Sequence, residues 1–104
     1  MASAEESTYE VSHVSAVVEQ IRELTKKARQ AGIQSEFVGA IEAIMEELKM
    51  RPLKWGDPEY HPKKPGSCVC HGIRDPLFVQ YAVYEPERKV LLLKIKPLPS
   101  SPLA

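Results

Sequence analysis

The spacing of the apolar positions changes along this chain, and each spacing predicts a different kind of element. The run from Tyr9 to Val14 is rich in β-prone residues and predicts a short strand. Ser15 follows as a suitable N-cap, and Gly32 predicts the end of the helix that Ser15 would begin. The positions that recur at helical spacing between these two residues are Val18, Ile21, Leu24, Thr25 and Ala28.

A second helix is predicted directly after the first. Ser35 suits its N-cap, and Pro52 forces its end. Its apolar stripe consists of Phe37, Ile41, Ile44, Met45 and Leu48. Because only a few residues separate the two helices, we expect an antiparallel helical hairpin.

The stretch from Arg51 to Ser67, "RPLKWGDPEYHPKKPGS", is the next feature. It holds four prolines and two glycines, so we expect a long basic loop with no regular element. Long loops in small domains often carry function.

The rest of the chain has the pattern of β-strands. The runs from Cys68 to Ile73, Pro76 to Tyr84 and Lys89 to Lys96 are separated by short breaks, which favours an antiparallel meander. In the last strand Leu91, Leu93 and Ile95 form an apolar face that we expect to meet the helices. Val90, Leu92, Lys94 and Lys96 form the other face.

These elements predict an α+β fold in which the helical hairpin packs on one face of an antiparallel sheet. We expect one domain over residues 9–98, with a flexible N-terminus at 1–8 and a flexible, proline-rich tail at 99–104.

Charge adds one hint. Residues 1–50 carry five basic and nine acidic side chains, whereas residues 51–104 carry nine basic and five acidic ones, although the 104-residue chain is neutral overall. The basic second half favours an anionic partner. There is no apolar run of transmembrane length and no signal-peptide pattern, so we expect a cytoplasmic protein with reduced thiols.

The segment "SCVCHG", residues 67–72, raises the question of a metal or Cys/His site. In a strand Cys68 and Cys70 share one face, while His71 points to the other. The spacing is C-x-C and there is no second cysteine pair to complete a zinc site. We therefore predict two buried, reduced and metal-free cysteines.

The order of strand, helical hairpin, basic loop and meander resembles the RelE/ParE toxin superfamily of toxin–antitoxin systems. The resemblance runs from Tyr9 to Leu98 and is carried by "YEVSHV" and by "HGIRDPLFVQYAVYEPERKVLLLKIKPL". It implies an antitoxin protein as partner. It also implies one of two activities, which are ribosome-dependent cleavage of messenger RNA or non-enzymatic poisoning of DNA gyrase.

For a RelE-like nuclease, the resemblance implies catalysis by lysines and arginines with a late tyrosine, without metal or other cofactor. We expect Arg74, Lys96 and Lys54 to be catalytic, with Arg74 first because its guanidinium can hold two phosphate oxygens. The expected RNA-binding residues are Lys63, Lys64, Lys94, Trp55, Tyr60, His71 and Tyr81.

Ordinary structural roles are the alternatives. These roles are solvated charge for Lys63 and Lys64, an ion pair with Asp75 or a turn for Arg74, and a hydrophobic lid on the helical hairpin for Trp55. The tail "PLPSSPLA" lacks both tyrosine and basic residues, which departs from the nuclease pattern. A gyrase-type toxin, or a silent relative with the same fold, therefore stays open.

Overall fold

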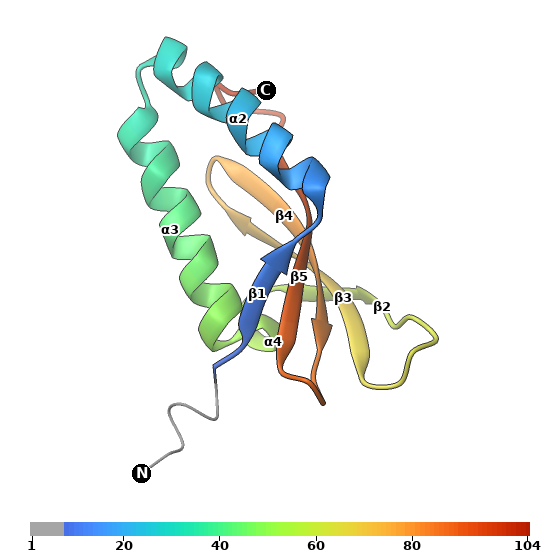
Figure 1. Ribbon diagram of the computed structural model, residues 1–104. Coiled ribbons are helices and arrows are strands. Elements are labelled where there is room, and N and C mark those ends of the chain that lie inside the picture. The colour runs from blue at the N-terminus through green and yellow to red at the C-terminus, as the bar shows by residue number, and fades with distance from the viewer. Residues whose placement is uncertain (1–7) are drawn as a thin grey trace.

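The computed structural model describes residues 8–104, and the expected flexibility of residues 1–7 lies outside this range. The N-terminal half supplies β1 (Glu10–His13), α2 (Ser15–Ala31), α3 (Gln34–Met50) and the single turn α4 (Pro52–Trp55). The C-terminal half supplies β2 (Asp57–Tyr60), β3 (Ser67–Arg74), β4 (Leu77–Tyr84) and β5 (Lys89–Pro97). Both helices lie to one side of the sheet and diverge from their short connection, so the predicted α+β architecture is confirmed (Figure 1).

Residues 8–104 form one sheet of five strands, in the order β1-β5-β4-β3-β2. The meander β3-β4-β5 is antiparallel as predicted, but β1 runs parallel to its neighbour β5, with Val11 opposite Val90. The sheet is therefore mixed. The first and last of the described strands, β1 and β5, lie side by side in it.

The loop expected over residues 51–67 is the first correction. It contains a helical turn and a strand, since α4 begins at Pro52 and β2 pairs antiparallel with β3. Proline is tolerated at the first position of a helix and on an edge strand, where its missing N–H is not needed. Pro52 therefore lies at the start of α4, and Pro58 lies in the edge strand β2.

The two predicted N-caps are also wrong. Helix α2 follows Val14 and α3 follows Ile33, and neither start has a side-chain cap. The stop at Gly32 is confirmed, because Gly32 takes a left-handed φ of 74° and its N–H bonds back to the carbonyls of Ala28 and Arg29.

The face of β5 that meets the helices differs from our expectation. Tyr81 lies opposite Leu92, but the next residue back, Gln80, lies opposite Lys94. Leu93 is thus the extra residue of a β-bulge, which reverses the alternation along the strand. As a result Val90, Leu92 and Ile95 are buried, whereas Leu91 and Leu93 are only partly buried.

The core lies between the helices and the sheet. Helix α2 contributes Val17 and Leu24, and α3 contributes Phe37, Ile44 and Leu48. The strands contribute Cys68, Cys70, Leu77, Val79, Tyr81, Val83, Val90, Leu92 and Ile95. No helix within residues 8–104 is both long and apolar enough to cross a membrane.

The C-terminal segment also takes part in this core. Residues 99–104 were expected to be a flexible tail, yet the side chain of Leu103 is fully buried. The N–H of Leu98 also donates to the carbonyl of Pro76 at 2.9 Å. The segment therefore packs against the domain although it adds no strand.

Candidate functional site

The face of the sheet that points away from the helices is the candidate site. Along β4, Leu77, Val79 and Tyr81 are buried in the core, so Phe78 and Gln80 point to the opposite side, where they are partly exposed. The register places Phe78 between Ile73 and Lys96, and Gln80 between His71 and Lys94. We call this surface, formed by His71, Ile73, Phe78, Gln80, Lys94 and Lys96, the open face.

Phe78 lies at the middle of the open face. The ring of His71 stacks on it, with centroids 5.6 Å apart and planes 17° apart. The ammonium group of Lys96 lies 5.0 Å from the centre of the same ring, within range of a cation–π contact. A flat aromatic surface thus stands between an imidazole and a cation, an arrangement suited to an unpaired nucleobase and its phosphate.

Glu59 of β2 orients His71. Its Oε2 atom lies 3.0 Å from Nδ1 of His71, and its Oε1 atom accepts a hydrogen bond of 2.9 Å from Nε2 of Gln80. A carboxylate at Nδ1 favours the tautomer with a proton there, which leaves Nε2 to exchange protons. The carboxylate of Asp57 lies 4.0 Å from Nε2 of the same ring.

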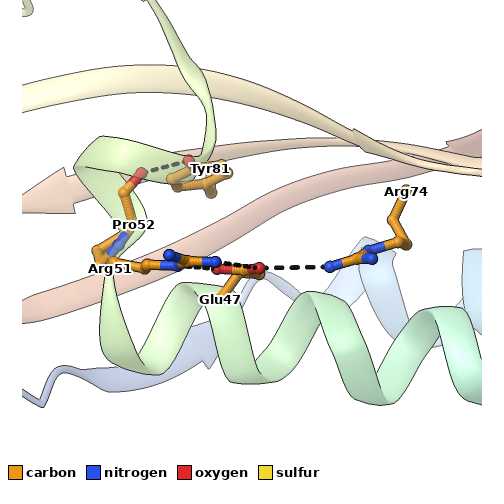
Figure 2. A network of polar contacts seen from close by, with 5 residues as sticks. All are labelled: Glu47, Arg51, Pro52, Arg74 and Tyr81. Atoms are coloured by element: carbon orange, nitrogen blue, oxygen red, sulfur yellow. Dashed lines mark hydrogen bonds and ion pairs between the residues drawn. The ribbon is translucent and has the colours of Figure 1, made fainter.

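Arg74, the leading catalytic candidate, lies on the helix side of the sheet. Its Nη2 atom is 3.3 Å from Oε2 of Glu47 on α3, and Glu47 also binds Arg51 through two hydrogen bonds of 2.6 and 3.1 Å (Figure 2). The hydrogen bond from Arg51 is the main cause that lowers the pKa of Glu47, and the charge of Arg74 adds to it. Arg74 is therefore engaged with α3, on the opposite side of the sheet from Lys94 and Lys96.

The other lysines are dispersed. Lys54 on α4 lines a pocket with Glu85 and Arg88 of the β4–β5 turn, at the other end of β5 from Lys96. Lys64 lies 3.6 Å from Glu87 and 4.9 Å from the ring centre of Tyr84. Lys63 is exposed. Arg74, the lysines of β5 and the lysines of residues 54–64 therefore do not meet at one surface.

The three candidate aromatic residues also differ in their positions. Tyr60 on β2 is 55% exposed and accessible to a partner. Trp55 is partly buried on the helix side, where it stacks on Tyr81 with centroids 6.0 Å apart. A Cβ on Gly72 would lie 2.5 Å from the Trp55 ring, so only glycine fits beneath it.

Tyr81 belongs to the core and not to an RNA-binding surface. It has no exposed area, and its hydroxyl donates a hydrogen bond of 2.5 Å to the carbonyl of Pro52 (Figure 2). Burial is the main cause that raises the pKa of Tyr81.

Cys68 and Cys70 share the helix-side face and are buried and unbridged, as their pattern predicts. Their Sγ atoms lie 3.6 Å apart. Burial first, and then the contact with Cys68, raises the pKa of Cys70 to about 12. Within residues 8–104 no three His, Cys, Asp or Glu side chains are grouped so as to hold a metal ion.

Sequence reasoning missed Phe78, Gln80 and Glu59. The alternation of β4 carried a signal for Phe78 and Gln80, since they occupy the positions between Leu77, Val79 and Tyr81. Glu59 had no such signal, because the segment around it was interpreted as a loop.

Comparison with known proteins supports the fold. No protein-family model matches this sequence, and no curated protein matches it significantly. The structure is similar to a chain of the archaeal RelE–RelB complex from Pyrococcus horikoshii OT3, with a TM-score of 0.60 and 17% identity over 90% of this chain and 99% of that one. It is also similar to a chain of the toxin–antitoxin complex RelBE2 from Mycobacterium tuberculosis, with a TM-score of 0.59 and 18% identity over 86% and 91%. The predicted RelE/ParE-like fold is thereby confirmed.

Proposed function

We propose that this protein is the toxin-like component of a toxin–antitoxin pair and that a cognate antitoxin protein binds it. The support is the fold, which it shares over about nine-tenths of its length with a chain of a RelE–RelB complex. Fold alone leaves the chemistry open, so the activity has to be argued from the open face.

The activity that we propose is metal-independent cleavage of messenger RNA on the ribosome. The observation that carries it is the placement of His71 and Lys96 on either side of Phe78, with His71 oriented by Glu59. An RNA base packs against the exposed edge of the Phe78 ring, and Lys96 and Lys94 lie against the scissile phosphate. Arg74 and Lys54 are not part of this arrangement, because they lie elsewhere on the molecule.

The proposed reaction follows from these positions. Nε2 of neutral His71 takes the proton of the ribose 2′-hydroxyl, and the 2′-oxygen attacks the adjacent phosphorus. The bond from phosphorus to the 5′-oxygen breaks, and that oxygen leaves with a proton from water. The products are a 2′,3′-cyclic phosphate and a 5′-hydroxyl end. Lys96 stabilises the extra negative charge as the pentavalent state forms.

The test is expression in bacteria without an antitoxin, combined with mapping of messenger RNA ends. We expect growth arrest with cuts in phase with codons, and cleavage in a purified translation system that leaves 2′,3′-cyclic phosphate and 5′-hydroxyl ends. His71→Gln should reduce the cleavage rate by about 10²–10⁴-fold, because glutamine can bond to Glu59 but cannot accept the proton. His13→Gln, on the exposed strand β1, is the matched control and should cleave normally.

A second candidate is a non-enzymatic toxin that binds a protein such as DNA gyrase. The observation that favours it is the dispersal of Arg74, Lys54 and Lys96 over three parts of the surface. Growth arrest with intact messenger RNA and gyrase-dependent DNA breaks would establish this candidate and exclude cleavage. Absence of arrest, with soluble folded protein, would exclude both toxin mechanisms.

A further inference from the structure

A separate pocket lies where α4 meets the turn between β4 and β5. Its volume is about 350 Å³, a size suited to a small ligand. It is lined by Tyr9, Met50, Arg51, Pro52, Leu53, Lys54, Glu85 and Arg88. Three of these eight side chains are cations and only one is an anion, so the pocket favours a negatively charged ligand.

Arg88 is the unusual residue of this pocket. Its backbone has a φ of 54°, a left-handed conformation that residues other than glycine rarely adopt. Two hydrogen bonds fix it there, since its N–H donates to the carbonyl of Glu85 and its carbonyl accepts from the N–H of Glu10. Such local strain often accompanies a functional position.

The side chain of Arg88 packs against an aromatic ring, but one of its hydrogen-bond donors has no partner. Its guanidinium lies 4.7 Å from the ring centre of Tyr9, which fixes its plane. Its Nε atom is the one buried side-chain nitrogen or oxygen in residues 8–104 that has no hydrogen-bond partner. Buried donors nearly always have partners, so the contacts of residues 8–104 leave the guanidinium of Arg88 incompletely satisfied.

The two other cations of the pocket, Arg51 and Lys54, differ in how many of their donors remain for a ligand. Arg51 uses Nε and Nη2 on Glu47, which leaves Nη1 for another acceptor. Lys54 is exposed and forms no ion pair with the described residues. The pocket therefore combines a guanidinium whose Nε has no partner, an ammonium without an ion pair among the described residues, and a guanidinium with one nitrogen still available.

We propose that this pocket binds the phosphate monoester of a nucleotide. Arg88 and Arg51 present planar guanidinium donors that suit phosphate oxygens, and Lys54 adds point charge. A phosphate monoester offers three acceptor oxygens to these three cations, whereas a carboxylate offers only two. The apolar side chains of Met50 and Leu53 receive the nucleoside, and the carboxylate of Glu85 accepts hydrogen bonds from its ribose hydroxyls.

The phosphate monoester has two sources, a free nucleotide or the 5′-phosphorylated end of an RNA. The test is titration of the whole protein with a nucleoside 5′-monophosphate, observed by NMR at the Nε–H resonance of Arg88 and by calorimetry. We expect the Arg88 resonance to shift at saturation, while acetate at equal ionic strength leaves it unmoved. An RNA oligonucleotide with a 5′-phosphate is then compared with the same sequence bearing a 5′-hydroxyl, and tighter binding of the phosphorylated form identifies an RNA end as the source.

Arg88→Gln should weaken nucleotide binding by about tenfold or more, since a hydrogen-bonded charge is lost. Arg22→Gln is the matched control, because Arg22 lies exposed on α2 and pairs with its helical neighbour Glu19. It should bind as the wild type does. The proposal is overturned if the monophosphate does not bind at millimolar concentration, if Arg88→Gln and Arg22→Gln bind equally, or if acetate shifts the resonance as strongly. This readout does not depend on RNA cleavage or toxicity.

Discussion

The hydroxyl of Tyr81 on β4 donates a hydrogen bond to the carbonyl of Pro52, the first residue of α4. This bond joins the middle of the sheet to the turn that follows the long helix α3. It lies in the core, out of contact with water, and it fixes where the segment leading to β2 leaves the helical layer.

Tyr81→Phe should lower the free energy of unfolding by about 1–3 kcal/mol, because the Pro52 carbonyl is left without its buried donor. Urea denaturation followed by circular dichroism measures this loss. Tyr84→Phe is the matched control, since Tyr84 is only partly buried and its hydroxyl has no hydrogen bond among the described contacts. Equal stability of the two variants would contradict the structural role of the Tyr81 bond.

The β-bulge in β5 predicts opposite outcomes for two adjacent leucines. Leu92→Ala should cost about 2–5 kcal/mol of unfolding free energy, because Leu92 is buried in the core. Leu93→Ala should cost clearly less, about 1 kcal/mol, because Leu93 is only partly buried. The two values come from the same denaturation measurement. A larger loss for Leu93 would show that β5 alternates without the bulge.

Glu47 predicts a dependence of stability on pH. Arg51, and then Arg74, lower its pKa in the folded protein below the ordinary value of about 4.3. A lowered pKa stabilises the fold above the ordinary pKa, and this stabilisation is lost as the pH falls through the folded value. The advantage of wild type over Glu47→Gln should thus be present at pH 7 and decrease below about pH 4. We expect it to be small, because Arg51 and Arg74 are exposed. A gap that widens on acidification would refute this account.

The cysteines predict slow thiol chemistry. A pKa of about 12 for Cys70 leaves very little thiolate at pH 8, and both sulfurs are buried. Alkylation of the folded protein by iodoacetamide should be at least about 100-fold slower than that of a free cysteine. Mass spectrometry with and without denaturant measures the two rates. Protein purified without chelator should also contain no stoichiometric zinc, and zinc bound at one equivalent would contradict the metal-free assignment.

The fold was largely predictable because its signals are local. Gly32 ends α2 by a conformation that other residues avoid, and the strands from Ser67 to Pro97 carry the β-prone residues and short breaks of a meander. The face of the sheet to which each side chain of β5 points was not predictable. A bulge at Leu93 depends on which residues of β4 lie opposite, and that information is absent from the strand itself.

The candidate site was predictable in part. Lys94, Lys96 and His71 do share the open face, since alternation placed the two lysines together and His71 away from the cysteines. Arg74 was misplaced because its partner Glu47 lies 27 residues earlier on another element. Tyr81 was expected to bind RNA because a tyrosine hydroxyl usually needs a polar partner. The sequence does not show that the carbonyl of Pro52 provides this partner inside the core.

The parallel pairing of β1 with β5 has a consequence for how the chain is made. Residues 10–13 find their strand partners at residues 89–92, almost the whole chain away. On the ribosome, α2 and α3 therefore emerge well before the strands that bury their apolar sides. The sheet is completed only after residues 89–92 have been synthesised, so this domain folds more slowly than its helices alone would.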